Sequence, residues 1–200
     1  MRESASWRRR SNPRAQPRTM ETSRLPRLSR AAKLTRNDKY MIVILHNIRS
    51  SHNVGSIFRT ADAAGCEKIY LCGITPAPID KYNRPASRLT KVSLGAEKYI
   101  PWKKIKSTLS LIKKLKKDGY TILAVEQSKN SIPYFQLSFP RKRESREKFA
   151  LVLGNELKGL SPAILSHTDK ILEIPMAGKK ESLNVAVTFG IIAFYLINKK

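Results

Sequence analysis

Polar side chains that could bind an anion or a polar ligand cluster in the stretch HNIRSSHNVGSIFRTADAAG, residues 46–65. Asn53 follows an apolar, strand-like run, and Arg59 comes six residues later in a segment whose apolar spacing predicts a helix. The first turn of a helix has free N–H groups and a positive potential, which suits an anion or a polar ligand. An alternative is that Asn53 only caps the helix and Arg59 pairs with a carboxylate. The spacing alone leaves both interpretations open.

A second motif, LVLGNELKGLSP, spans residues 151–162. Gly154 ends a predicted strand, and without a Cβ atom it would let a ligand approach the backbone at the carboxyl end of a sheet. Glu156 follows two residues later, and Gly159 allows another sharp turn. Junctions between strands and helices often carry Gly and Glu for turn geometry alone, so this motif by itself is weak evidence for a site.

A third motif, IPMAGKKESLNVAV, spans residues 174–187. Pro175 ends a predicted strand, Gly178 gives a flexible turn, and either Ser182 or Asn184 could cap the apolar helix that follows. One residue is enough to cap a helix. Capping therefore leaves the second polar side chain unexplained.

Taken together and in this order, the three motifs resemble those of the SpoU/TrmH family of RNA ribose 2′-O-methyltransferases, within the SPOUT class, from about residue 40 to residue 198. The resemblance implies an α/β fold with a deep C-terminal trefoil knot, S-adenosylmethionine as the cofactor, and a homodimer in which each site is completed by the neighbouring subunit. It also implies that the second and third motifs bind the cofactor, at Leu153, Gly154, Ile174, Pro175, Met176 and Leu183.

The same resemblance implies five catalytic residues: Arg59, Asn53, Glu156, Ser182 and Asn184. Arg59 matches the family arginine proposed to activate the ribose hydroxyl. Because a guanidinium has a pKa above about 12, it is a poor base, so we expect Arg59 to orient the ribose or a phosphate and to stabilise developing negative charge. Asn53 and Asn184 are expected to hold Arg59 and the ribose, with Ser182 adding a hydrogen bond. Glu156 is expected to anchor Arg59 or a neighbouring loop rather than to act as the base.

Hydrophobic periodicity predicts strands that alternate with helices, and hence a mostly parallel sheet covered on both faces. The expected strands are 41–45, 68–73, 120–126, 149–154 and 170–175. The expected helices are 53–64, a short one ending at Leu94, 102–117, 160–167, and a last one from about Leu183. In the helix over 102–117, Ile105, Leu109, Ile112 and Leu115 are expected to face inward.

The chain divides into a basic arm and one folded domain. Residues 1–38 are rich in Arg, Ser and Pro and are predicted to be disordered, whereas residues 39–200 form the expected methyltransferase domain. Residues 138–149 are strongly basic and lack an apolar face, which predicts an inserted surface loop. Such a loop is more typical of a solvated surface than of a phosphate-binding site.

The charge balance favours a polyanionic partner, since 39 Lys and Arg against 15 Asp and Glu give a net charge of +24. A nucleic acid is the expected partner, because a membrane surface would call for a lipidation motif or a basic amphipathic terminal helix. The family resemblance implies that this nucleic acid is RNA, either tRNA or rRNA. The longest apolar run, residues 185–197, is too short to span a bilayer, and Cys66 and Cys72 form no disulfide framework. No His or Cys cluster has metal-ligand spacing. We therefore expect a cytoplasmic protein without a metal site.

Two alternatives to a methyltransferase differ in class. A non-catalytic RNA-binding protein that keeps the fold would not need the five polar residues Asn53, Arg59, Glu156, Ser182 and Asn184. A nucleotide-binding dehydrogenase would need a GxGxxG motif after the first strand, which is absent from the sequence. The residues therefore favour the methyltransferase interpretation over both.

Overall fold

A computed structural model of the chain describes residues 39–80, 82–138 and 147–199. Within these ranges, seven strands form one sheet in the order β3-β2-β1-β6-β4-β7-β5, and every neighbouring pair is parallel. The strands are β1 (Lys39–His46), β2 (Lys68–Cys72), β3 (Trp102–Ile105), β4 (Thr121–Val125), β5 (Ile132–Pro133), β6 (Glu147–Leu153) and β7 (Lys170–Glu173). The helices are α2 (Ser51–Ala64), α3 (Ser87–Ser93), η1 (Ala96–Lys98), α4 (Thr108–Lys117), η2 (Tyr134–Gln136), α5 (Pro162–Leu165) and α6 (Val185–Asn198). The predicted parallel α/β architecture is confirmed.

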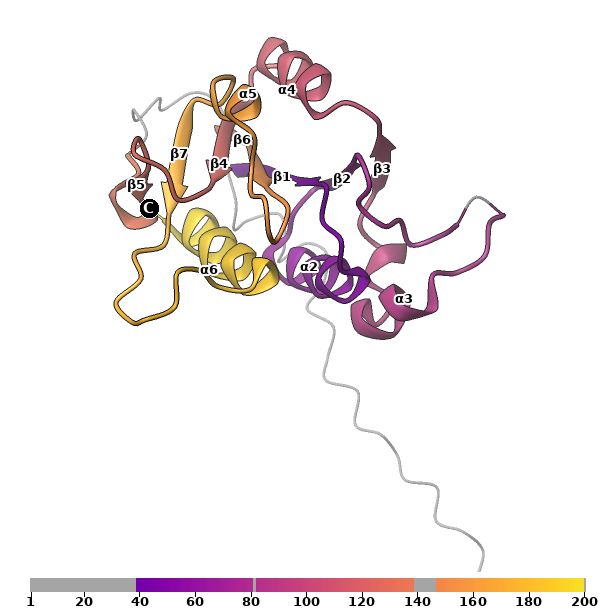
Figure 1. Cartoon of the computed structure of the whole chain (residues 1–200). Helices are drawn as coiled ribbons and strands as arrows, with labels where there is room; N and C mark the ends of the chain where they lie inside the picture. Colours follow the sequence, from indigo (N-terminus) through magenta and orange to yellow (C-terminus); the bar gives the residue numbers. More distant parts are fainter. Residues whose placement is uncertain (1–38, 81, 139–146, 200) are drawn as a thin grey trace, which may run out of the picture.

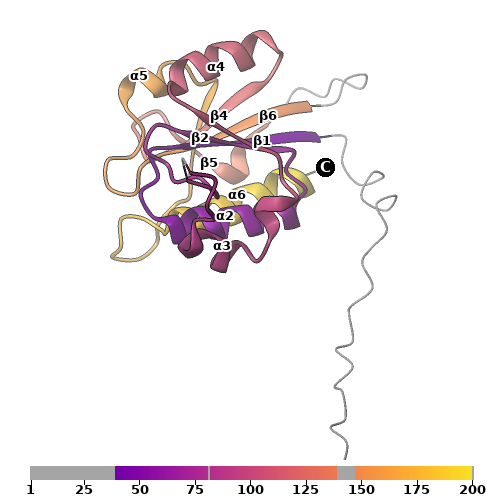
Figure 2. The same cartoon turned by 90° about the vertical axis from the view of Figure 1, so that its right-hand side faces the viewer.

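Helices cover both faces of this sheet, with α2, α3 and α6 on one side and α4 and α5 on the other (Figures 1 and 2). The middle strand β1 shows why its sequence is apolar without a break. Met41, Val43 and Leu45 belong to the core under α2 and α6, while Ile42 and Ile44 belong to the core under α4 and α5. A strand buried on both faces needs apolar side chains at every position.

Helix α2 begins two residues earlier than the sequence predicts, because Ser50 is its N-cap. The Ser50 side chain accepts a hydrogen bond from the Asn53 backbone N–H at 3.2 Å. The helix ends at Gly65, whose φ of 71° is the left-handed conformation that glycine adopts without strain. Capping is therefore the role of Ser50, and the side chain of Asn53 is available for other contacts.

The single helix predicted over 102–117 is wrong at its start. Trp102–Ile105 forms strand β3, paired with β2, and α4 begins only after the N-cap Ser107, which accepts from the Ser110 N–H at 3.3 Å. Leu109 is only half-buried. Local spacing fitted a helix, but hydrogen bonding to a strand distant in the sequence decided otherwise.

The other predicted elements are confirmed with small shifts at their ends, whereas β5 and η2 were not anticipated. Strand β6 begins at Glu147, inside the range 138–149 that was assigned to the basic loop. Residues 139–146 of that loop and the basic arm 1–38 lie outside the described residues. Among the described helices, none combines the length and the apolar character needed to cross a membrane.

Candidate active site

A cavity of about 530 Å³ lies at the carboxyl edge of the sheet and is lined by the segments that follow β4, β6 and β7. The strands are parallel, so their carboxyl ends meet at one edge, which is where open α/β sheets bind ligands. In Figure 2 the loops after β6 (orange) and β7 (yellow) project from the same side of the sheet. The second and third sequence motifs thus meet at this cavity, together with Asn53 from the first.

A chain of hydrogen bonds joins the three motifs at the cavity wall. The Glu156 carboxylate accepts from the backbone N–H groups of Arg49 at 2.9 Å and Ser50 at 3.1 Å, and from Asn53 Nδ2 at 3.1 Å. Asn53 Oδ1 in turn accepts from Asn184 Nδ2 at 3.0 Å. Asn53 is buried, so its carboxamide is held at both ends in one orientation.

Asn184 caps helix α6 and bridges to α2 at the same time. Its Oδ1 accepts from the Ala186 backbone N–H at 2.8 Å, while its Nδ2 donates to Asn53. Ser182 lies on the cavity wall and is exposed. Of the two candidate caps, therefore, Asn184 is the one that caps the helix.

Glu156 is ionised at neutral pH. Burial by itself raises the pKa of its carboxyl, but hydrogen bonds from the backbone of Arg49, of Glu156 itself and of Ser50, and from Asn53, outweigh burial and lower the pKa. Of the two anchoring roles expected for Glu156, the structure shows contact with the neighbouring loop after β1.

Arg59 does not join this group within one chain. It is exposed on α2, does not line the cavity, and has no side-chain hydrogen bond or ion pair among the described residues. Six residues of helix separate Arg59 from Asn53 by about 9 Å along the axis and about 120° around it. The structure thus brings Asn53, Glu156, Ser182 and Asn184 together and leaves Arg59 apart.

Most of the residues expected to bind a cofactor line the cavity: Leu153, Gly154, Ile174, Met176 and Leu183. Pro175 is exposed and does not line it. A Cβ atom on Gly154 would lie 2.6 Å from the carbonyl carbon of Gly159 and 2.8 Å from the nitrogen of Leu160. The glycine is thus required for close packing within its own turn, and the approach of a ligand to its backbone stays a prediction.

Several polar residues on the cavity wall escaped the sequence reasoning, among them Glu126, Gln127 and Glu173. Glu126 Oε2 accepts from the Leu160 N–H at 2.7 Å, and Gln127 Nε2 donates to the Glu181 carbonyl at 2.6 Å. They sit at or just beyond the ends of β4 and β7. The rule that ligands bind at the carboxyl ends of parallel strands is the signal that would have found them.

The loop after β1 is fixed by a second hydrogen-bonded cluster. Asn47, at a φ of 56°, donates from Nδ2 to His46 Nε2 at 3.0 Å, and its Oδ1 accepts from the Ile74 N–H at 3.1 Å. His46 Nδ1 lies 2.7 Å from Thr108 Oγ1, and Asn155 Nδ2 donates to the Asn47 carbonyl at 2.7 Å. Burial lowers the pKa of His46, which keeps the ring neutral. This cluster positions the N–H groups that Glu156 binds.

The lining can therefore take a ligand with an apolar ring and positive charge. The residues that line the cavity include three glutamates, Glu126, Glu156 and Glu173, together with apolar side chains. No group of three or more His, Cys, Asp or Glu that could hold a metal ion occurs among the described residues.

Comparison with known proteins gives one consistent family. The model of the SpoU rRNA Methylase family matches residues 40–194. A tRNA (guanosine(18)-2′-O)-methyltransferase from Aquifex aeolicus is 31% identical over 161 residues, which cover 80% of this chain and 70% of that protein. The crystal structure of an AdoMet-bound rRNA methyltransferase from Sinorhizobium meliloti matches with a TM-score of 0.68 at 28% identity, over 78% of this chain and 54% of that one. The crystal structure of an A. aeolicus TrmH/SpoU tRNA modifying enzyme matches with a TM-score of 0.68 at 29% identity, over 82% of this chain and 77% of that one.

Proposed function

Because the chain belongs to the SpoU rRNA Methylase family, we propose that it uses S-adenosylmethionine to methylate a ribose 2′-hydroxyl in tRNA or rRNA. The observation that carries this proposal is the hydrogen-bonded link Glu156–Asn53–Asn184, which joins all three motifs at the wall of one cavity. Neither a helix cap nor a turn requires that link.

The cavity fits S-adenosylmethionine in chemical character. Apolar side chains such as Leu153, Ile174 and Leu183 suit the adenine ring, and the carboxylates of Glu126 and Glu173 suit a ligand with sulfonium and ammonium charges. When bound, the cofactor supplies a methyl group on a positively charged sulphur, which is a good electrophile. The protein is left to orient and activate the ribose hydroxyl.

Asn53 and Asn184 are the residues best placed to orient the ribose, since their carboxamides are held by each other and by Glu156. Fixed polar groups of this kind lower the entropic cost of aligning the hydroxyl with the methyl group. Glu156 anchors them and is a weak base, because its pKa is lowered. Arg59 stabilises the charge that develops on the hydroxyl oxygen.

A homodimer accounts for the position of Arg59 outside the cavity of its own chain. Leu183, Val187 and Phe194 on and before α6 are 40%, 51% and 42% exposed, and apolar helix surfaces of this kind are typical of interfaces. Helix α6 also packs beside α2, with Gly190 close to Thr60. A second copy on this surface would lie next to Arg59, and the Arg59 of one copy would then complete the site of the other.

A trefoil knot is the proposed form of the C-terminal segment. Strand β7 lies two positions from β6 in the sheet, and the chain must return from there to α6, which packs on α2. Between β7 and α6, the Glu181 carbonyl accepts a hydrogen bond from Gln127 Nε2. Within α6, Tyr195 Oη donates to the Phe135 carbonyl at 2.7 Å. These contacts of the C-terminal segment with residues that follow β4 support the proposal that the segment is threaded.

The proposed setting is the cytoplasm, where tRNA and rRNA are found. Two observations on the cysteines agree with a reducing compartment. Cys66 and Cys72 are both free and buried, and burial raises the pKa of Cys66 to about 12, which leaves its thiol protonated.

The test is methyl transfer to RNA isolated from cells that lack the protein, with tritium-labelled S-adenosylmethionine and mapping of 2′-O-methyl positions. We expect the wild-type protein to label one or a few riboses, and Arg59→Ala to lose transfer while it still binds S-adenosylhomocysteine in calorimetry. Lys113→Ala, which removes an exposed cation of α4 on the opposite face of the sheet, is the control. A wild-type protein that binds RNA and labels none of it would favour the non-catalytic alternative. Full transfer by Arg59→Ala would refute the role of that residue.

A further inference from the structure

The loop that follows β2 ends in an aromatic and basic tip that the proposed reaction does not use. In Figure 1 the described parts of this loop, residues 74–80 and 82–86, extend beyond β3 and α3. At its tip Tyr82 is 64% exposed, and the side chain of Arg84 is 70% exposed. Exposed aromatic rings beside cations are the usual means of holding single-stranded nucleic acid.

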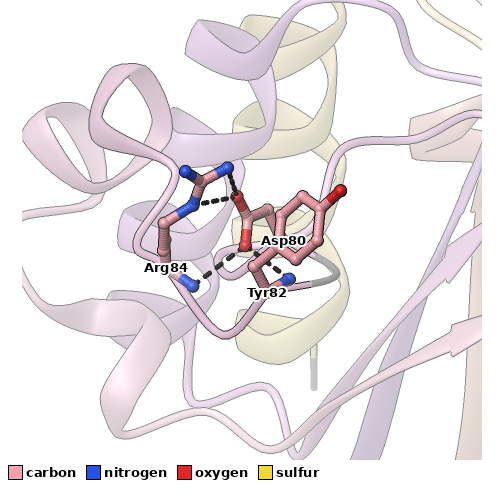
Figure 3. Close-up of polar contacts among 3 residues, drawn as sticks. All are labelled: Asp80, Tyr82 and Arg84. Carbon is pink, nitrogen blue, oxygen red and sulfur yellow. Dashed lines mark hydrogen bonds and ion pairs between the residues drawn. The ribbon is translucent and has the colours of Figure 1, made fainter.

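Asp80 holds this tip in one conformation (Figure 3). Its Oδ1 accepts from the backbone N–H groups of Tyr82 at 2.8 Å and Arg84 at 2.9 Å, and its Oδ2 accepts from Arg84 Nε at 2.9 Å. The hydrogen bond from the Arg84 backbone is the largest of the causes that lower the pKa of Asp80, so the carboxylate stays ionised at neutral pH. A tip that is ordered before binding loses less conformational entropy when a ligand arrives.

The base of the loop is fixed to the body of the domain. Thr75 is fully buried, the Ala86 N–H donates to the Pro78 carbonyl at 2.9 Å, and Ile79 and Pro85 form an antiparallel bridge. Thr75 ties the loop to the sheet, since its Oγ1 donates to the Leu45 carbonyl at 2.9 Å and accepts from the Ile48 N–H at 3.0 Å. Apart from residue 81, Pro78–Ala86 is therefore a short hairpin whose shape is set by hydrogen bonds within it.

Arg84 orients the ring of Tyr82. Its guanidinium carbon lies 4.9 Å from the ring centroid, within the range of a cation–π contact. The same guanidinium is paired with Asp80 at 2.9 Å, so part of its charge is neutralised locally. Arg84 is consequently better suited to fixing the ring than to binding a phosphate by itself, and the ring is the surface that the hairpin offers.

The hairpin faces the same edge of the sheet as the cavity. It follows the carboxyl end of β2, and the cavity is formed beyond the carboxyl ends of the parallel strands β4, β6 and β7. Exposed Arg88 and Lys91 on α3 follow it in the chain, and the protein carries a net charge of +24. A polyanion that lies across this edge would meet the hairpin as well as the cavity.

We propose that Tyr82, held by Asp80 and Arg84, stacks on an unpaired base of the RNA substrate at a position away from the methylated ribose. The inference rests on the proposed function, since it takes RNA as the substrate. Stacking on an aromatic ring tolerates any base, so the hairpin would select RNA by its structure rather than by its base sequence. The structure selected is an unpaired nucleotide at a set distance from the target ribose.

The test compares Tyr82→Ala with Tyr82→Phe in the full chain. Binding is measured by fluorescence anisotropy with a fluorescein-labelled single-stranded RNA of twelve mixed nucleotides and with the duplex of the same sequence. We expect Tyr82→Ala to weaken binding of the single strand by about 5- to 100-fold and binding of the duplex much less. Tyr82→Phe keeps the ring and should bind like the wild type. Tyr99→Ala, which removes another exposed tyrosine at 66%, is the matched control.

Equal binding by Tyr82→Ala and the wild type would overturn the proposal, and so would equal losses on single strand and duplex. A loss in Tyr82→Phe as large as that in Tyr82→Ala would also overturn it, because the hydroxyl would then be the contact. Methyl transfer by the wild type to cellular RNA is measured in parallel. If it is present while Tyr82→Ala binds normally, the inference fails and the proposed function stands.

Discussion

Glu156→Ala tests whether a single carboxylate holds the first motif against the second. The substitution removes three hydrogen bonds, from the N–H groups of Arg49 and Ser50 and from Asn53 Nδ2. Because Glu156 and Arg49 are exposed, water can replace part of each bond. We therefore take about 0.7 kcal/mol per bond, near the low end of the usual range, or about 2 kcal/mol in total. For a domain of this size such a loss lowers the Tm by about 4–8 °C.

The measurement is thermal and urea unfolding followed by circular dichroism, in a double-mutant cycle with Asn53→Ala. The Asn53–Glu156 bond is lost in both single variants, so the double variant should lose about 0.7 kcal/mol less than their sum. Glu181→Ala, which removes an exposed glutamate near the cavity, is the control.

The lowered pKa of Glu156 gives a second readout. Its stabilising contribution is present above the ordinary value of 4.5 and is lost as the pH falls below it towards the native pKa. A Tm for Glu156→Ala within 1 °C of the wild type, or additive losses in the cycle, would refute the anchoring role.

Three further outcomes are expected. Asn184→Asp keeps the acceptor that caps α6 but puts a carboxylate oxygen in place of the amide that donates to Asn53 Oδ1, so the Tm should fall by about 2–4 °C while methyl transfer falls at least about tenfold. Gly159→Ala should lower the Tm more than Gly119→Ala, because both have a positive φ but only the Cβ at 159 would meet the Glu126 carboxylate, at 2.3 Å. Burial lowers the pKa of His46 from 6.5, so stability in urea should be greatest above that pH and fall below it, and His46→Gln should flatten this dependence.

Much of the fold is encoded locally and could be predicted. The apolar runs that became β1, β2, β4, β6 and β7 are continuous because both faces of the sheet are covered, and continuous apolar runs need no knowledge of their partners. The start of α4 could not be found in this way. Trp102 and Ile105 fit helical and extended spacing alike, and pairing with β2 chose between them.

The site, like the fold, was predictable from the sequence only in part. The motifs themselves mark Asn53, Glu156 and Asn184, but no motif shows that these three side chains bond to one another. Glu126 and Glu173 stayed hidden because each is a lone acidic residue at a strand end, and a lone residue has no spacing to recognise.

The sequence by itself determined the alternation of strands and helices and the family of the protein. The alternation follows from the spacing of apolar residues within each segment, and the family follows from the residues and order of the three motifs. Only the tertiary structure decided which polar residues share a wall, because the hydrogen bonds from Asn184 to Asn53 and from Asn53 to Glu156 join segments more than a hundred residues apart. It also decided that Arg59 lies off the cavity of its own chain, since the face a helical residue presents depends on what the helix packs against. The polar pair before α6 shows the difference best. Spacing made both Ser182 and Asn184 candidate caps, whereas the structure shows that Asn184 caps α6 and also bonds to Asn53 of α2.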